Sequence, residues 1–351
     1  MNSYIPEKIK RMKEYIPDTS CPDIKLDANE SPYPTPEKVL NAIKNSIDLD
    51  SLNRYPDPDM KELLASYGRF VGVSPDRLVA GDGSDELIAL IINTFLADGG
   101  KILITEPDFS MYAFYADFAG AEIVRYRKKD GIDIDISALK TLIKEENVRL
   151  VLFSNPCNPT GEMLSAEEIK ALMDGSDALF VVDEAYMEFA PKPESVIALT
   201  EEKDNLIVLK TVSKIGLAGL RCGFAVSNTE LIAALKKTKS PYNLNSVTQK
   251  AVAVAMDNYA EIGENVEKIK AAVTLTYEKL KKYEDTLGFE MRRGNGNFVY
   301  IRFKENGGAA KVHAFLKENG ISVRLMGNCL RITAGTAEEV EALDLCLVSL
   351  K

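Results

Sequence analysis

Lys214 is the first residue of this chain whose surroundings point to covalent chemistry. It lies in the segment Lys210-Thr-Val-Ser-Lys214-Ile-Gly-Leu-Ala-Gly-Leu-Arg221, after a predicted strand, where α/β sheets bind ligands. Its small neighbours let the backbone approach a ligand closely. A lysine whose pKa is lowered by desolvation or nearby cations can form a Schiff base with an aldehyde, and the guanidinium of Arg221 suits a phosphate. An exposed loop lysine and a surface arginine are the alternative interpretation.

A second candidate group begins in the apolar run Phe180-Val-Val-Asp183 and continues to Tyr186. An aspartate that ends a buried strand directs its carboxylate into the ligand crevice, where it can hold a pyridinium nitrogen protonated. Tyr186, three residues later, can donate a hydrogen bond to a phenolate oxygen. A metal-binding Asp-Glu pair of the nucleotide-hydrolysing proteins is disfavoured, because the chain has no GxxxxGKS/T segment. A helix-capping aspartate remains an open alternative.

Two further segments have residues suited to a ligand with a ring and a phosphate. Ser154-Asn-Pro-Cys-Asn158-Pro-Thr-Gly161 follows a predicted strand; its prolines restrict the turn, and Asn158 can hydrogen-bond to a ring oxygen. Gly81-Asp-Gly83-Ser84-Asp85-Glu86 opens a predicted helix, whose free N–H groups and dipole favour a phosphate. A plain turn is the alternative for the first segment, and an ordinary helix N-terminus is the alternative for the second.

The elements that must position these residues alternate along the chain after a proline-rich segment. Helices are expected at 37–47, 59–71, 84–96, 112–118, 137–145, 165–173 and 230–237, and strands at 101–105, 122–127, 150–154, 178–183, 206–209 and 222–225. Buried β-branched strands between helices indicate a mostly parallel sheet that is covered on both faces.

The C-terminal part indicates a smaller α+β unit. A long helical stretch at 246–283 leads into a strand at 297–302, a helix at 308–319, a strand at 328–333 and a helix at 337–349. Three parts are expected: an irregular N-terminal arm at 1–36 that packs on the small unit or on a partner subunit, a large domain at 37–245 and a small domain at 246–351.

Composition excludes several classes of protein. The 351 residues carry a net charge of −10 and a single histidine, His313, which excludes a multi-histidine metal site. The acidic balance argues against a nucleic-acid surface. No apolar run is long enough to span a bilayer, and the N-terminus lacks the apolar core of an export signal. Five scattered cysteines without a CxxC motif fit reduced thiols, so we expect a cytoplasmic protein with no metal.

In their order and separations, the four segments resemble the fold-type I pyridoxal-phosphate aminotransferases, and most closely the histidinol-phosphate aminotransferase family. Three further strings support this resemblance, which runs from about residue 15 to the C-terminus: Leu26-Asp-Ala-Asn29-Glu30-Ser-Pro-Tyr, Arg54-Tyr55-Pro-Asp-Pro and Asn328-Cys-Leu-Arg331-Ile-Thr-Ala-Gly-Thr. The resemblance implies an α/β fold with a mostly parallel, seven-stranded sheet in the large domain and a smaller α+β domain. It also implies pyridoxal 5'-phosphate as the cofactor.

The resemblance also implies roles for individual residues. Lys214 would bind the cofactor covalently, Asp183 would pair with its ring nitrogen, and Tyr186 and Asn158 would hold its phenolic oxygen. The phosphate would be held by Ser213, Arg221 and the backbone at Gly83-Ser84-Asp85, and Tyr112 would stack on the ring. One residue fewer separates Lys214 from Arg221 than is usual in the family, which implies either a tighter turn at Ile215-Gly216 or a different register that changes the placement of Arg221.

The same resemblance implies substrate contacts and a dimer. Arg331 would grip an amino-acid carboxylate, Arg324 would be a second substrate arginine, and Asn29 would lie against the substrate. Tyr55 would reach the phosphate of the neighbouring subunit's cofactor, and Tyr15 would cross to the partner's site, which implies a homodimer acting on small molecules.

The expected reaction converts L-histidinol phosphate and 2-oxoglutarate into imidazole acetol phosphate and L-glutamate, a step of histidine biosynthesis. Threonine-phosphate decarboxylation and aromatic amino-acid transamination are alternatives on the same scaffold. A non-catalytic binding module would be expected to lose Lys214 or Asp183, and both are present.

Overall fold

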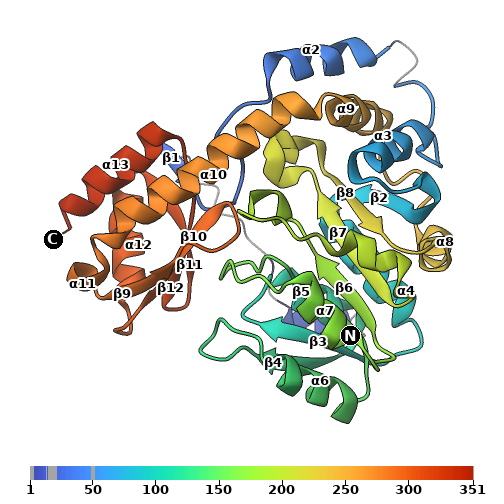
Figure 1. The fold of residues 1–351 in the computed structure, drawn as a ribbon, viewed down its shortest axis with the longest axis horizontal. Helices are drawn as coiled ribbons and strands as arrows, with labels where there is room; N and C mark the ends of the chain where they lie inside the picture. The colour runs from blue at the N-terminus through green and yellow to red at the C-terminus, as the bar shows by residue number, and fades with distance from the viewer. Residues whose placement is uncertain (1–3, 13, 15–21, 49–51, 351) are drawn as a thin grey trace.

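Seven strands form the larger sheet of the computed structural model, which describes residues 4–12, 14, 22–48 and 52–350. Across the sheet, the strands are β2 (Leu78–Asp82), β8 (Cys222–Val226), β7 (Leu206–Thr211), β6 (Leu179–Asp183), β5 (Val148–Ser154), β3 (Lys101–Glu106) and β4 (Glu122–Arg127). Neighbours from β7 to β4 run parallel, while β8 is antiparallel to both β7 and β2. The expected mostly parallel sheet is confirmed (Figure 1).

Helices cover both faces of this sheet because its strands are apolar on both sides. In β6, Phe180 and Val182 enter one core, and Leu179 and Val181 enter the other, as the alternation of side chains along a strand requires. One face is covered by α4 (Gly83–Phe95), α5 (Met111–Ala119) and α8 (Thr229–Thr238). The other is covered by α2 (Glu37–Ser46), α3 (Lys61–Val71), α6 (Ile136–Glu145), α7 (Ala166–Met173), α9 (Ser246–Asp257) and the first part of α10 (Tyr259–Lys281).

A second sheet of five strands forms the smaller unit. Its order is β1 (Ile24–Leu26), β11 (Ile321–Met326), β12 (Cys329–Thr333), β10 (Phe298–Phe303) and β9 (Phe289–Arg292). It is accompanied by α11 (Glu284–Leu287), α12 (Gly308–Glu318) and α13 (Ala337–Val348), and it lies beside the larger unit at the far end of α10 (Figure 1).

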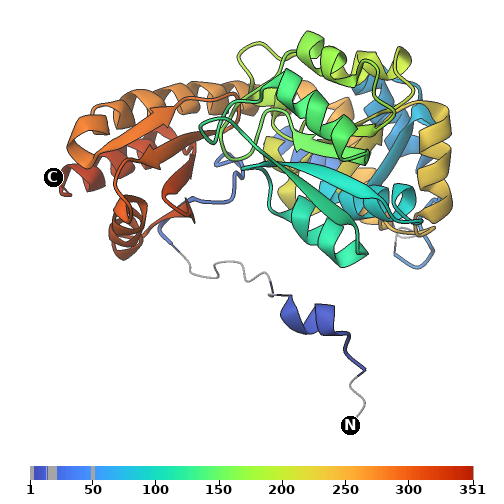
Figure 2. The same ribbon diagram turned by 90° about the horizontal axis from the view of Figure 1, so that it is seen from below.

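The N-terminal arm contains regular elements that the sequence did not indicate. β1 pairs in parallel with β11, and a short helix, α1 (Glu7–Arg11), lies outside the main body (Figure 2), where Lys8 donates to the carbonyl of Phe118 at 2.9 Å. β1 has three residues, which is too short for a reliable period-two pattern. The expectation of an irregular arm is therefore wrong at 7–11 and 24–26.

Three other expectations needed correction. β2 was missed because its sequence, LVAGD, has one β-branched residue and ends in Gly81 and Asp82. β9 and β11 were also missed. The long helical stretch at 246–283 is two helices that meet at Asn258, whose backbone N–H bonds to the carbonyls of Val254 and Ala255.

The two hydrophobic cores divide within α10. Val266 and Ile269 pack with the core of the larger sheet, whereas Ala272 and Val273 pack with the core of the smaller one. The boundaries drawn from the sequence stay predictions, and this packing favours a join within α10 rather than at residue 246. Among the described residues, no helix is long and apolar enough to cross a membrane, and no group of three His, Cys, Asp or Glu residues could hold a metal ion.

Candidate active site

Two adjoining cavities lie near the carboxyl ends of β5, β6 and β7, the edge at which parallel α/β sheets bind ligands. The smaller has a volume of about 340 Å³ and the larger about 850 Å³, and both are lined by Lys214, Asn158 and Tyr186. The smaller cavity also collects most of the residues expected to bind a cofactor: Ser84, Asp85, Tyr112, Asp183, Ser213 and Arg221.

Lys214 lies in a π-helical turn, η5 (Ser213–Leu217), directly after β7. Gly216 has a φ of 104°, a conformation that strains any residue with a Cβ, so glycine permits the tight turn expected between Lys214 and Arg221. The lysine Nζ lies 3.4 Å from the carbonyl oxygen of Ala28 and 5.9 Å from the centre of the Tyr186 ring. The turn therefore places the amine between the N-terminal arm and the residues that follow β6.

Asp183 is the buried last residue of β6. Its carboxylate accepts hydrogen bonds from the Tyr112 hydroxyl at 2.8 Å and from the backbone N–H of Ala185 at 3.1 Å. Burial raises the pKa of Asp183 to about 6, while these two hydrogen bonds act in the opposite direction. Because burial disfavours the charged carboxylate, a cation placed against it would be strongly favoured.

Asn158 and Tyr186 each take part in hydrogen bonds that join the two units. The side-chain oxygen of Asn158 accepts from Arg331 Nη1 at 2.6 Å, so its NH₂ group is the end that can donate to a ligand. The Tyr186 hydroxyl accepts from the side-chain amide of Asn29 at 3.0 Å, which leaves the hydroxyl proton for another acceptor. Asn29 is itself held by Thr333, whose hydroxyl donates to the amide oxygen at 3.0 Å.

The first turn of α4 and Arg221 lie close together at one end of the smaller cavity. This end of the cavity suits an anion. Arg221 Nη2 lies 3.3 Å from an oxygen of Asp85. A Cβ on Gly83 would lie 2.7 Å from Arg221 Nη2, and a Cβ on Gly223 would lie 2.6 Å from the backbone nitrogen of Ser84. The glycines therefore allow β8, Arg221 and the N-terminal N–H groups of α4 to converge, as a phosphate site requires.

These donors fit pyridoxal phosphate. A helix N-terminus and an arginine converge at one place, a buried carboxylate suits a protonated ring nitrogen, and a lysine can receive the aldehyde. A Cβ on Gly83 or Gly223 would occupy the space in which Arg221 and the backbone at Ser84 come close together. The absence of both Cβ atoms therefore leaves the donors grouped closely enough to bind a small anion.

Comparison with known proteins connects this geometry to a family. A family model for aminotransferases of class I and II matches residues 22–343. The chain belongs to this family.

Similar proteins include two histidinol-phosphate aminotransferases. The one from Clostridium kluyveri is 35% identical over 326 residues, or 91% of each chain. Histidinol-phosphate aminotransferase 1 from Carboxydothermus hydrogenoformans is 36% identical over 341 residues, covering 96% of this chain and 95% of that one. Among solved structures, histidinol-phosphate aminotransferase from Sinorhizobium meliloti in complex with pyridoxal-5'-phosphate has a TM-score of 0.88 at 24% identity, covering 100% of this chain and 99% of that one. This aminotransferase therefore shares its fold.

The larger cavity is lined by arginines and lysines together with four aspartates, Asp27, Asp85, Asp108 and Asp130. Arg324 and Arg331 occupy paired positions on β11 and β12, and both line it, as expected of substrate arginines. Lys25 and Arg302 line it as well, and the sequence did not single them out. Arg302 lies on β10, next to β12, and its Nη1 donates to the carbonyl oxygen of Asp130 at 2.5 Å. Strand pairing, which the sequence could not show, is what brings Arg302 to this cavity.

Other residues of the site were missed or lie elsewhere. Phe109 and Thr211 line the smaller cavity; their only signal is that they lie close to Tyr112 and Ser213 in the sequence. Tyr112 is fully buried and packs edge-on against Phe109, with ring centres 5.5 Å apart, so its stacking role stays a prediction.

The two tyrosines expected at a partner's site do not line these cavities. Tyr55 is 81% exposed and stacks on Tyr242 at 4.6 Å between ring centres. Tyr15 lies outside the described residues.

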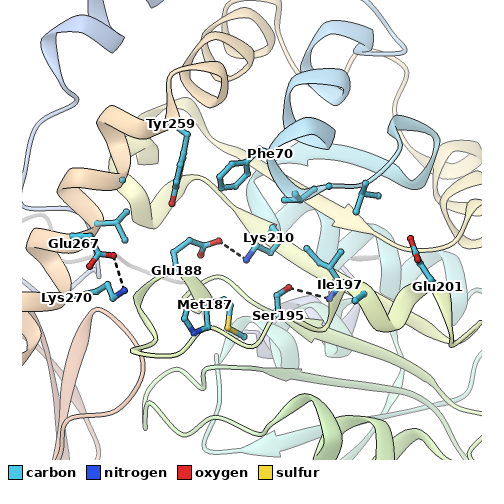
Figure 3. Close-up of a pocket in the computed structure, with 17 residues that line it drawn as sticks. Phe70, Met187, Glu188, Ser195, Ile197, Glu201, Lys210, Tyr259, Glu267 and Lys270 are labelled. Carbon is cyan, nitrogen blue, oxygen red and sulfur yellow. Dashed lines mark hydrogen bonds and ion pairs between the residues drawn. The ribbon is translucent and has the colours of Figure 1, made fainter.

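A third cavity, of about 820 Å³, adjoins the segment that carries Asp183 and Tyr186 (Figure 3). It lies between α10, the end of α3 and the loops after β6, and Met187 and Glu188 contribute to its wall. Lys210 projects into it and pairs with Glu188 at 2.7 Å. Because none of the expected site residues lines this cavity, we do not assign it to the reaction of this aminotransferase.

Proposed function

We propose that the chain transfers the amino group of L-histidinol phosphate to 2-oxoglutarate, with pyridoxal 5'-phosphate as its cofactor. Its products are imidazole acetol phosphate and L-glutamate. The observation that carries the proposal is the connection of two cavities through Lys214: one fits pyridoxal phosphate, and the other is lined by Lys25, Arg302, Arg324 and Arg331. Both substrates are anions, one with a phosphate and one with two carboxylates, and arginines suit both groups.

The proposed chemistry assigns a task to each protein group. When bound, pyridoxal phosphate supplies a carbonyl for the amine and a ring that withdraws electrons from the amino-bearing carbon. Lys214 would move the proton from that carbon to the former aldehyde carbon of the cofactor, and in the opposite direction when 2-oxoglutarate becomes glutamate; such proton transfer typically contributes about 10²–10⁴-fold to a rate. Asp183 stabilises positive charge on the ring nitrogen. Arg331 and Arg324 orient the anionic ends of the substrates.

Names of the relatives support this choice of substrate. Curated relatives at 32% to 36% identity over more than 90% of the chain are called histidinol-phosphate aminotransferases. One observation favours a second candidate: L-threonine-O-3-phosphate decarboxylase from Porphyromonas gingivalis has a similar fold, with a TM-score of 0.79 at 21% identity over 93% of this chain and 99% of that one.

A homodimer is part of the proposal. Tyr55 and Tyr242 form a stacked pair of exposed rings, and an exposed aromatic pair of this kind is typical of an interface. Such a position would let Tyr55 reach the cofactor of a partner. The cytoplasmic location stays a prediction from the sequence.

A two-substrate assay tests the reaction. Purified protein with pyridoxal phosphate is given histidinol phosphate and 2-oxoglutarate, and glutamate is measured; a parallel sample is given threonine phosphate, and carbon dioxide is measured. A third sample with phenylalanine and 2-oxoglutarate measures aromatic transamination. Glutamate only from histidinol phosphate is expected, and Lys214→Ala should abolish it. Carbon dioxide without glutamate would refute the proposal in favour of the decarboxylase.

A further inference from the structure

Asp108 and Lys128 form a buried ion pair near the candidate cofactor cavity, and Asp108 is also among the residues that line the larger cavity. The side chain of each is 1% exposed, and Lys128 Nζ lies 3.7 Å from an oxygen of Asp108. Neither residue was singled out by the sequence motifs, and neither lines the smaller cavity. Burying two charges is costly unless excellent geometry and further hydrogen bonds compensate, so a pair in this place calls for an explanation.

The Asp108 carboxylate joins two loops that follow neighbouring strands of the sheet. On the β3 side, it accepts from the hydroxyl of Thr105, near the end of the strand, at 2.6 Å and from the backbone N–H of Phe109 at 2.8 Å. On the β5 side, it accepts from the backbone N–H of Ser154, the last residue of the strand, at 3.3 Å and from the Ser154 hydroxyl. β3 and β5 are hydrogen-bonded neighbours, so this single carboxylate fixes the loop ends of both strands relative to each other.

Each of these loops carries a group expected to touch the cofactor. The Ser154 hydroxyl that donates to Asp108 accepts from the backbone N–H of Asn158 at 3.0 Å. On the other side, Phe109 lines the smaller cavity, and its carbonyl accepts from the backbone N–H of Tyr112 at 3.1 Å. Asp108 is thus connected to Asn158 through the Ser154 hydroxyl. It also directly precedes Phe109, whose carbonyl bonds to Tyr112.

Lys128, the residue after β4, supports the same two loops. Besides its pairing with Asp108, its ammonium lies 2.8 Å from the sulfur of Cys157, the residue before Asn158. Its backbone N–H bonds to the carbonyl of Glu106 at 2.8 Å, at the end of β3. The lysine side chain at this position pairs with Asp108 and reaches Cys157, and an apolar side chain could do neither.

We propose that Asp108, paired with Lys128, is a positioning residue that holds the Phe109–Tyr112 turn and the Asn158 loop in the arrangement required to bind pyridoxal phosphate. The inference rests on the proposed function, because the cofactor belongs to that function. Asp108 acts on the cofactor through Ser154, Asn158 and Tyr112.

The test measures the rate at which holoenzyme releases pyridoxal phosphate, followed by visible absorbance, together with the thermal midpoint of unfolding. Ser154→Ala removes the hydroxyl between Asp108 and Asn158 without changing any charge. It should release the cofactor about tenfold faster with little change in midpoint, because one hydrogen bond to the loop is typically a modest term for the whole fold. Cys157→Ser is the matched control in the same loop, and its release rate should stay within about twofold of wild type.

A double variant separates positioning from a purely structural role. Lys128→Met alone leaves a buried charge and should lower both the midpoint and cofactor retention. Asp108→Asn with Lys128→Met removes both charges, so the midpoint should recover. Release should remain fast, because an amide at position 108 offers one acceptor oxygen where the carboxylate offers two.

Two outcomes would overturn the proposal. In the first, the double variant recovers both the wild-type midpoint of unfolding and the wild-type rate of cofactor release. In the second, Ser154→Ala releases the cofactor as slowly as Cys157→Ser does. A wild-type chain that does not retain pyridoxal phosphate would instead refute the proposed function, and the positioning role with it. A chain that retains the cofactor but fails in the substrate assay leaves this test intact.

Discussion

Asp183 combines two properties that rarely occur together: it is buried, and its proposed role requires it to be charged. Burial raises its pKa from 3.8 to about 6, so in the cofactor-free protein its ionisation destabilises the fold. A positive ring nitrogen would reverse this effect, since an opposite charge favours the carboxylate. The residue is therefore placed so that cofactor binding relieves a cost built into the empty protein.

This cost gives a pH-dependent prediction for Asp183→Asn. Between the unfolded pKa of 3.8 and the folded pKa of about 6, the folded chain binds more protons than the unfolded chain, so the contribution of Asp183 to the free energy of unfolding falls as pH rises through this window. In cofactor-free protein, the free energy of unfolding of the variant relative to wild type should therefore rise by about 1 kcal/mol from pH 5 to pH 7.

Urea denaturation of both proteins without cofactor at these two pH values provides the measurement. Tyr186→Phe, which removes a hydroxyl from the same cavity and no carboxylate, is the control variant, and its difference from wild type should be the same at both pH values. A constant difference for Asp183→Asn as well would show that the carboxylate is not destabilised by burial.

At the residue scale, the sequence identified groups at strand ends but not the residues that hold them. Lys214 and Asp183 follow apolar runs directly, so local sequence was enough to place them at the ligand edge of the sheet. Asp108 and Lys128 are twenty residues apart in the chain, and their meeting depends on the pairing of β3 with β4 and β5. No local pattern encodes that pairing.

At the scale of elements, the phosphate end of the site depends on how closely β8 approaches α4. Gly223→Ala should destabilise the protein by about 1–3 kcal/mol, because overpacking against fixed atoms forces a backbone shift. The atoms that the new Cβ would meet are backbone atoms, the nitrogen of Ser84 at 2.6 Å and the carbonyl carbon of Gly83 at 2.7 Å. The same shift should weaken binding of pyridoxal phosphate, which a titration of the variant would measure.

Gly263→Ala is the matched control for this substitution. Gly263 lies inside α10, and a Cβ there would be 3.7 Å from the Tyr259 ring, an ordinary contact. Alanine in a helix interior is favoured over glycine by up to about 1 kcal/mol, so stability should stay the same or increase. If Gly223→Ala behaved like Gly263→Ala in both stability and cofactor binding, the close approach of β8 to α4 would not matter.

Elements were predictable where their hydrophobic period was long and unbroken. The central strands, such as β5 and β6, are buried on both faces and appear as continuous apolar runs, which the sequence showed. β1 and β2 have three and five residues, and each takes its strand conformation from a partner, β11 or β8, that is far away in the sequence. Tertiary pairing, rather than local propensity, decides such segments.

At the scale of the whole molecule, the charge of −10 coexists with a cavity whose lining has five cationic side chains and four aspartates. Local potential and net charge are separate quantities, so an acidic protein can still bind anionic substrates. The cationic side chains come from both units: Lys25 from the arm strand β1, and Arg302, Arg324 and Arg331 from the small sheet, facing Lys214 of the large one. The site therefore requires both units.

The homodimer proposal leads to a prediction that concerns two chains at once. Tyr55 is exposed in the single chain, whereas Lys214 lines the candidate cofactor cavity. If Tyr55 serves the site of the partner, each complete site needs Lys214 from one subunit and Tyr55 from the other. Tyr55→Ala and Lys214→Ala should each have low activity. After subunit exchange in a mixture, half of the dimers should be mixed, each with one site that has both native residues, so activity should return to about a quarter of the wild-type value. Glutamate formation, measured before and after exchange, gives the comparison.

Asp183→Asn mixed with Lys214→Ala is the control for chain mixing itself. Both residues line the same cavity of one chain, so a mixed dimer keeps one defect in each of its sites, and exchange should restore no activity. Equal recovery in both mixtures, or recovery in neither, would contradict a Tyr55 that serves the neighbouring site.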